Sequence, residues 1–271
     1  MQPAASAVRP SCPEQTIPRN PEKTDVMTPF VAELLGTLLM ILLGNGVVAN
    51  VVLERTKGRG GGWIVITTGW ALAVFVGVVV AGPFSGAHLN PAVTLGFALT
   101  GQFAWSAVPG YVAAQLIGAA AGAALVWLFY YTHLKATEDP ARKLDLFCTS
   151  PAIADRRFNF AGEMIATFVL IFSVFYISDG NLTLPDDGTT LPVGLGSVGA
   201  LPVAFIVWAI GLSLGGTTGY AINPARDLAP RAMHALLPMG TKGSSRWSYA
   251  WIPVLGPLCG AAAAALLFSG I

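Results

Sequence analysis

Charged side chains are scarce in this chain. Asp, Glu, Lys and Arg make up 11% of its 271 residues, against roughly 25% in a typical soluble domain. Hydrophobic residues make up 54%, and the mean hydropathy is +0.64. The formal net charge is only +1, so the chain lacks the basic balance typical of nucleic-acid-binding proteins and no nucleic-acid partner is expected. The composition predicts a protein that crosses a membrane several times.

Cysteine is also rare. Cys12, Cys148 and Cys259 are far apart and form no CxxC pair. This spacing indicates neither a disulfide framework nor a metal site, and we expect no metal and no cofactor. Residues 1–27 are polar, proline-rich and without an apolar run, so we expect a disordered tail and not a signal peptide.

The remaining residues, 28–271, are expected to form one membrane domain. Their apolar runs are each long enough to cross a hydrocarbon core of ~30 Å. Six spans are predicted, at residues 29–52, 63–82, 105–131, 159–178, 200–216 and 247–271.

The tripeptide Asn-Pro-Ala occurs twice, beginning at Asn90 and Asn223, which are 133 residues apart (223 − 90). Proline favours the first position of a helix, and asparagine favours the cap before it. The first of these helices, from Pro91 to about Thr100, would rise about 15 Å, half of the hydrocarbon core. We therefore predict two half-helices that enter the membrane without crossing it.

The two halves of the chain also align outside these tripeptides. Glu33–Thr37 is similar to Glu163–Thr167, and the Tyr-Gly-Gly spacing that begins at Tyr111 recurs at Tyr249. Two repeats follow, at about residues 28–131 and 159–271, with three spans each. An odd number of spans inverts the second repeat in the membrane, and inverted repeats with interrupted helices are typical of a transport pathway.

Irregular backbone at membrane depth is tolerated only against protein or a wet cavity. We therefore expect residues 83–89 and 215–222 to line a pore. Inversion would point the positive N-termini of both half-helices at each other, with the amides of Asn90 and Asn223 in the lumen. Such a field repels cations and suits small uncharged polar solutes. A single Asn-Pro-Ala could be an ordinary helix cap, but two at matching positions favour the pore. The expected pore-lining loop residues are Gly86, Ala87, His88, Gly219 and Ala221.

Five ionisable residues have expected roles around this pore. Arg226 lies within the membrane region, where an ionisable side chain is functional by default, although an interfacial arginine is the alternative. Glu33 and Glu163 are expected to accept hydrogen bonds from the loop backbones, with a packed, protonated acid as the alternative. His88 is expected to anchor its loop with one edge in the lumen, and Asp227 to shape the second loop.

The segments 85–94 and 219–227 resemble the aquaporin superfamily, and Asp227 directly after Arg226 resembles its aquaglyceroporin, or glycerol facilitator, branch. The resemblance covers residues 28–271. It implies an all-α membrane fold with six transmembrane helices and two re-entrant half-helices. It also implies a pore in each protomer of a homotetramer in lipid, and a multi-pass cell-membrane protein with both termini in the cytoplasm. The positive-inside rule would choose the reverse orientation.

The same resemblance implies a narrow selectivity filter at Trp70, Gly211, Tyr220 and Arg226. Gly211 would leave space, and the two aromatic rings would form an apolar corner. The expected function is passive diffusion of glycerol and similar polyols with some water, without enzymatic chemistry and with protons and ions excluded. The alternatives are a water-preferring channel, an ion-coupled transporter, a structural membrane protein and an intramembrane enzyme; the last would depend on Glu33 and Glu163 as its acids.

Overall fold

The computed structural model describes residues 27–178, 180–184 and 190–271. The tail predicted at residues 1–27 lies almost entirely outside the described part of the chain. Within these described residues, six helices are long and apolar enough to cross a membrane. They are α1 (Pro29–Val52), α2 (Trp63–Ser85), α4 (Val108–Phe129), α7 (Arg156–Phe175), α8 (Leu201–Leu214) and α10 (Ile252–Gly270), with 3₁₀ turns at Trp105–Ala107 and Gly196–Ala200 before α4 and α8.

Two short helices begin at the Asn-Pro-Ala tripeptides, α3 (Pro91–Leu99) and α9 (Pro224–Leu236). Each has an asparagine N-cap and proline at its start. Asn90 Oδ1 accepts from the Ala92 N–H at 2.9 Å, and Asn223 Oδ1 accepts from the Ala225 N–H at 3.0 Å. The predicted fold, six membrane helices and two half-helices, is confirmed.

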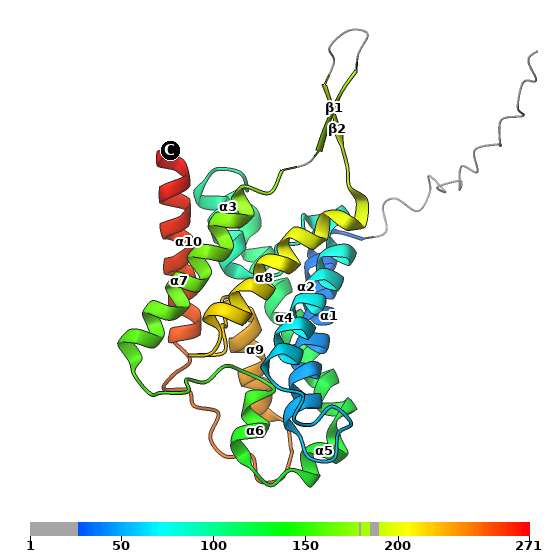
Figure 1. Ribbon diagram of the computed structural model, residues 1–271, viewed down its shortest axis with the longest axis vertical. Coiled ribbons are helices and arrows are strands. Elements are labelled where there is room, and N and C mark those ends of the chain that lie inside the picture. The colour runs from blue at the N-terminus through cyan, green and yellow to red at the C-terminus, as the bar shows by residue number, and fades with distance from the viewer. Residues whose placement is uncertain (1–26, 179, 185–189) are drawn as a thin grey trace, which may run out of the picture.

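The packing follows the repeat. In the first half α1 packs against α4, and in the second α7 packs against α10. Each half-helix also packs on a long helix of the other repeat: α3 packs on α10, and α9 packs on α4. The two repeats therefore interlock in one body, and Figure 1 shows α9 enclosed among the long helices.

Close helix contact within each repeat depends on glycine. A Cβ at Gly118 would lie 2.3 Å from the Leu34 carbonyl oxygen of α1, and a Cβ at Gly260 would lie 2.3 Å from the Met164 carbonyl oxygen of α7. Real Cβ atoms do not approach so closely, so the GxxxG faces of α4 and α10 bring their backbones against the first helix of their own repeat.

Three features differ from the sequence-based expectation. Helix α2 continues through Pro83 to Ser85, where an irregular segment was expected from residue 83. A proline near a helix end removes one hydrogen bond but leaves the following turn intact. The charged segment between the third and fourth predicted spans, for which no helix was expected, contains the short helices α5 (Tyr131–Ala136) and α6 (Pro140–Asp145). The polar linker before α8 forms an antiparallel hairpin of β1 (Gly180–Thr183) and β2 (Thr190–Val193), which projects from the end opposite α5 and α6 (Figure 1).

Candidate pore and selectivity filter

The two re-entrant loops repeat the same backbone geometry. Positive φ angles occur at Gly86, Ala87 and Leu89, and again 133 residues later at Gly219, Tyr220 and Ile222. The values at the four non-glycine residues lie between 37° and 52°. This left-handed region costs an L-residue roughly 1–2 kcal/mol, so the surrounding contacts must hold each loop in place.

Glu33 supplies those contacts in the first repeat. This buried carboxylate accepts hydrogen bonds from the backbone N–H groups of His88 at 2.8 Å and Leu89 at 2.7 Å. It also accepts from the hydroxyl of Ser85 at 2.7 Å and from the amide of Gln115 at 2.8 Å. A carboxylate inside α1 thus satisfies backbone donors that have no helix or strand to pair with.

Glu163 repeats this arrangement in the second repeat. Its carboxylate accepts from the N–H groups of Ala221 at 3.0 Å and Ile222 at 2.9 Å, and from the hydroxyl of Thr218 at 2.6 Å. These three donors are the counterparts of His88, Leu89 and Ser85 at an offset of 133. The contacts are those expected of an acceptor that shapes a loop, whereas the contribution to conduction stays a prediction.

The capping asparagines join the two repeats. Asn90 Nδ2 donates to the Ile222 carbonyl at 2.8 Å, and Asn223 Nδ2 donates to the Leu89 carbonyl at 2.8 Å. Each amide nitrogen has two N–H groups, so one is used in this cross-bond and one stays available to a solute. The half-helix N-termini therefore meet through a reciprocal pair of hydrogen bonds, which sequence reasoning did not anticipate.

Two cavities meet at the second re-entrant loop. The pore cavity has a volume of about 140 Å³ and is lined by both Asn-Pro-Ala starts, including Asn90 and Asn223, and by apolar side chains of the spans. The vestibule has a volume of about 460 Å³ and is lined by the loops around α6 and before α9. Three residues line both cavities and mark the junction between them: Trp70, Tyr220 and Arg226.

Arg226 is held against an aromatic face. Its guanidinium carbon lies 4.3 Å from the centre of the Trp70 ring, within the range of a cation–π contact. The side chain is buried, and its Nη1 has no hydrogen-bond partner among the described residues. An arginine buried in this way is not an interfacial, snorkelling residue. Its free N–H groups are the strongest directed donors at the junction.

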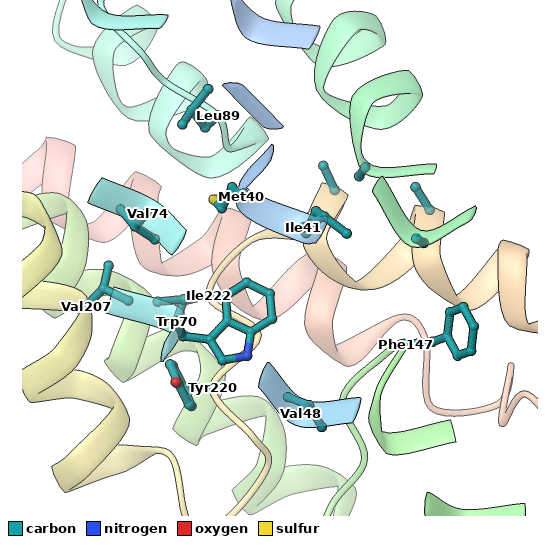
Figure 2. Close-up of a cluster of buried hydrophobic side chains, with 14 of the residues drawn as sticks. Met40, Ile41, Val48, Trp70, Val74, Leu89, Phe147, Val207, Tyr220 and Ile222 are labelled. Atoms are coloured by element: carbon teal, nitrogen blue, oxygen red, sulfur yellow. The ribbon is translucent and has the colours of Figure 1, made fainter. Parts of the chain in front are cut away.

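The Tyr220 ring lies in the space that Gly211 leaves. A Cβ at Gly211 would lie 2.9 Å from Tyr220 Cζ and 3.0 Å from the Tyr220 hydroxyl oxygen. The space that Gly211 leaves is thus taken up by the Tyr220 ring, and the place of Gly211 in the selectivity filter stays a prediction. The Tyr220 hydroxyl is buried and has no hydrogen-bond partner within the described chain. Figure 2 shows Tyr220 beside Trp70 and Val207 in the buried apolar cluster.

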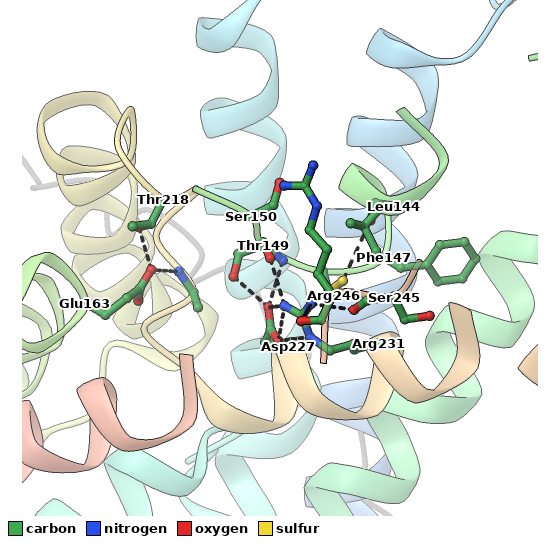
Figure 3. A network of polar contacts seen from close by, with 12 residues as sticks. Leu144, Phe147, Thr149, Ser150, Glu163, Thr218, Asp227, Arg231, Ser245 and Arg246 are labelled. Carbon is green, nitrogen blue, oxygen red and sulfur yellow. Dashed lines mark hydrogen bonds and ion pairs between the residues drawn. The ribbon is translucent and has the colours of Figure 1, made fainter. Parts of the chain in front are cut away.

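Asp227 belongs to a buried cluster that ties three segments together (Figure 3). Arg231 donates from Nε to Asp227 Oδ1 at 2.8 Å and from Nη2 to Oδ2 at 3.0 Å. The Asp227 carboxylate also accepts from the backbone N–H and hydroxyl of Thr149, at 2.7 and 2.6 Å. Arg231 donates in turn to the carbonyls of Thr149 and Ser245, both at 2.8 Å. The cluster fixes Thr149, which lines the vestibule, against α9.

His88 is packed on one side and open on the other. Its ring stacks on Phe97, meets Phe103 edge-on and lies 3.1 Å through Nδ1 from the Thr94 hydroxyl. It also lines the pore cavity. The structure places it where an anchor with one edge in the lumen was expected. Of the other loop residues named from the sequence, Gly86, Ala87 and Ala221 line the pore cavity and Gly219 lines the vestibule.

Sequence reasoning missed four residues at this site. Gln115, Thr149 and Arg231 hold the loops, and Trp63 contacts the filter from the start of α2. Arg231 carried a signal, because an i, i+4 acid–base pair with Asp227 is readable from the sequence. Thr149 and Trp63 carried none, since their contacts join segments about 80 and 150 residues apart.

Comparison with known proteins agrees with this geometry. Residues 21–268 match the family model described as Major intrinsic protein. The chain belongs to the major intrinsic protein family. Within this family it is 52% identical over 243 residues to a probable glycerol uptake facilitator protein of Thermotoga maritima, covering 90% of this chain and 99% of that protein. It is 50% identical over 244 residues to a glycerol uptake facilitator protein of Streptococcus pneumoniae, covering 90% and 99%.

A solved structure of the same family has the same architecture. The X-ray structure of the aquaglyceroporin from Plasmodium falciparum superposes with a TM-score of 0.75 at 29% identity, covering 90% of this chain and 95% of that one. The predicted membership of the aquaglyceroporin branch is thereby confirmed, as is the multi-pass membrane character of this family member.

Proposed function

We propose that this chain is a passive membrane channel for glycerol and similar small uncharged polyols, with some water. The observation that carries the proposal is the junction of Trp70, Tyr220 and Arg226 between the two cavities. There an apolar wall of aromatic rings faces an arginine with unpaired N–H groups. The names of the glycerol uptake facilitators at about 50% identity support the same solute.

Glycerol has a carbon edge and a hydroxyl edge, and this junction offers a partner for each. The rings of Trp70 and Tyr220 suit the carbon edge, because contact there removes apolar surface from water. Arg226 donates to the hydroxyl edge, and the Tyr220 hydroxyl adds a further donor and acceptor. Below the junction the valines of the pore cavity continue the apolar wall, and the asparagine amides continue the polar one.

Cations, protons among them, are repelled by fixed positive charge. Helices α3 and α9 point their N-termini toward the Asn90–Asn223 pair, and each carries roughly half an elementary charge. Arg226 adds a full charge at the junction. A neutral solute exchanges hydrogen bonds along this path, whereas a cation is repelled by the fixed positive charge. Permeation involves no covalent step, so the protein is not an enzyme, and no coupling ion is required.

The active form is proposed to be a homotetramer in the cell membrane, with a pore in each protomer and both termini in the cytoplasm. Large apolar side chains stay exposed along the outside of the single chain, among them Leu72, Leu128, Phe129, Phe205 and Leu266. Lipid and neighbouring protomers would cover this surface.

Stopped-flow light scattering of proteoliposomes tests the proposal with water, glycerol, urea and a longer polyol. Rapid re-swelling in glycerol, linear with concentration and unaffected by ion gradients, is expected. Fast water flow without glycerol flow would favour the water-preferring alternative. Saturation at low glycerol concentration with ion dependence would favour a coupled transporter, and the absence of any solute flux would favour a structural protein.

A further inference from the structure

Trp63, the first residue of α2, contacts two filter positions at once. Its indole Nε1 donates a hydrogen bond to the Gly211 carbonyl at 2.9 Å. Its ring meets the Tyr220 ring edge-on, with centroids 5.9 Å apart and an interplanar angle of 78°. Trp63 also lines the vestibule, next to the junction formed by Tyr220 and Arg226.

The Gly211 carbonyl is one that needs a partner. It lies in the last turn of α8, which ends at Leu214, and the last four carbonyls of a helix have no regular N–H donor within the helix. The Trp63 N–H therefore acts as a cap for the end of α8, supplied from a helix that is 148 residues away in sequence.

The end of α8 is a flat surface for the Tyr220 ring. Gly211 and Gly215 are one helical turn apart and both face it. A Cβ at Gly215 would lie 2.5 Å from Tyr220 Cδ1 and 2.8 Å from Trp63 Cζ2. The Tyr220 ring is thus held between Gly211, Gly215 and the Trp63 indole. How closely it packs against the two glycines determines how far it projects into the filter.

We infer that Trp63 is a positioning residue that sets the width of the filter, by capping α8 and holding Tyr220 against its two glycines. The inference rests on the proposed conduction of polyols. The two contacts of Trp63 have different effects. Its indole ring limits the motion of the Tyr220 ring away from the pore, and its N–H holds the end of α8 on which the Tyr220 ring lies.

Two substitutions separate these contacts. Trp63→Phe keeps a ring beside Tyr220 but loses the N–H donor, whereas Trp63→Gln keeps a donor but loses the ring. Trp247→Phe is the matched control, since Trp247 is half-exposed and lines neither cavity. None of these residues touches the Asn90–Asn223 pair, so single-file conduction persists in all three variants.

The measurement is the permeability ratio of erythritol to glycerol in proteoliposomes, because a four-carbon polyol probes filter width. A ratio that rises about fivefold in Trp63→Phe, the factor that corresponds to about one net hydrogen bond, is expected, with a larger rise in Trp63→Gln. Trp247→Phe should keep the ratio of the unsubstituted protein. A ratio of permeabilities is independent of the amount of folded channel, so a variant that merely folds poorly would lose flux without changing it.

The two possible failures are distinct. If the unsubstituted protein conducts no glycerol, the proposed function is wrong. If it conducts glycerol and both Trp63 variants keep its erythritol-to-glycerol ratio, Trp63 does not set the filter width and the inference is overturned. A ratio that changes in Trp63→Gln alone would assign the effect to the ring and overturn the capping step.

Discussion

Gly211 and Tyr220 must be considered as one unit, because the ring occupies the space that the glycine leaves. A substitution at either position changes the fit of the other. Residues in contact in this way show non-additive effects of 0.5–3 kcal/mol. A single substitution at Gly211 or Tyr220 therefore disturbs the filter more than it would if the four positions were independent.

The first prediction concerns this pair. Gly211→His should reduce both glycerol and water flow, because the new Cβ would lie 2.9 Å from Tyr220 Cζ and push the ring into the pore. Adding Tyr220→Ala should restore water flow while glycerol flow stays low. Stopped-flow rates of the two single variants and the double variant, normalised to reconstituted protein, give the comparison. Gly110→Ala is the control, since a Cβ there meets nothing within 4 Å. If water flow were reduced equally in the Gly211→His variant and in the double variant, the Tyr220 ring would not be the group that the new side chain displaces.

The second prediction concerns the Tyr220 hydroxyl. Tyr220→Phe removes a buried hydroxyl that has no protein partner in the described residues, and with it a donor and acceptor for the permeating molecule. Water depends on hydrogen bonds more than glycerol does, since it has no carbon edge for the ring. The ratio of water to glycerol permeability should therefore fall by about two- to fivefold. An unchanged ratio would show that the hydroxyl faces away from the solute.

At the scale of elements, the re-entrant loops depend on the carboxylates behind them. Four non-glycine residues of these loops have positive φ, a conformation that must be held by surrounding contacts. Glu33 and Glu163 compensate by accepting backbone N–H groups that would otherwise be buried and unpaired. The pore shape is therefore maintained by helices α1 and α7 and not by the loop sequences alone.

Glu163→Gln tests this dependence. The amide offers one acceptor oxygen where the carboxylate offers two, and its NH₂ group would face N–H donors. The loss is about 3 kcal/mol for hydrogen bonds to a charged acceptor, or a fall of about 6–12 °C in the melting temperature of the purified channel. Glu138→Gln removes an exposed carboxylate and should leave the melting temperature unchanged. Equal melting temperatures of the two variants would contradict the role given to Glu163.

The Asp227–Arg231 pair supports the other side of the filter. Asp227→Asn leaves the fully buried Arg231 without its charge partner, which costs about 3–5 kcal/mol in comparable sites. The variant should melt at a lower temperature and admit larger polyols, because Thr149 loses its anchor beside the vestibule. Arg142→Gln breaks a partly exposed pair with Glu54 and should cost under about 1 kcal/mol. Similar melting temperatures of the two variants would contradict this view of the cluster.

Sequence reasoning placed the elements well wherever apolar runs or capping residues mark them. Both half-helices begin at the residue that Asn-Pro indicates, and α1 has the predicted bounds. The reasoning failed where the local signal is weak. Pro83 suggested an early end to α2, and the hairpin of β1 and β2 lies in a segment whose glycines, prolines and aspartates suggested only a linker.

For the whole molecule, the structure explains why basic residues gather at the end that carries α5 and α6. Arg59 and Arg142 both pair with Glu54, and Lys143 donates to the carbonyls of Met239 and Thr241. These cations close the loops around the vestibule. Under the proposed orientation the charge distribution opposes the positive-inside rule, and we propose that these structural contacts are the reason.

The proposed orientation can be tested by labelling from outside intact cells. In a chain with Cys12→Ser and Cys259→Ser, Glu138→Cys near α6 should react with a membrane-impermeant maleimide, and Asn181→Cys in β1 should not. The native Cys148 is buried and serves as an internal blank. Labelling of the hairpin alone would reverse the assignment. Chemical labelling suits this region better than proteolysis, because its short helices and buried Lys143 hold it folded.

The site residues that could be predicted from the sequence are those that occur at matching positions in both repeats. Glu33 and Glu163 are offset by 130 residues (163 − 33) and Asn90 and Asn223 by 133 (223 − 90), so each copy supports the other. Trp63, Gln115 and Thr149 have no such counterpart. Gln115 contacts Glu33 and Thr94 within its own repeat, whereas Trp63 and Thr149 contact residues of the second repeat. Only the folded chain brings Trp63 within hydrogen-bond distance of Gly211.

The reciprocal bonds between Asn90 and Ile222 and between Asn223 and Leu89 also set an order of events during synthesis. When the first half enters the membrane, the Asn90 amide and the Leu89 carbonyl have no partner yet, because residues 222 and 223 are still to be made. At 5–20 residues per second this interval lasts about 7 to 27 s. The first half of the nascent chain must therefore keep its loop in contact with water, lipid headgroups or an insertion factor. The two reciprocal hydrogen bonds form only when the second half has been made.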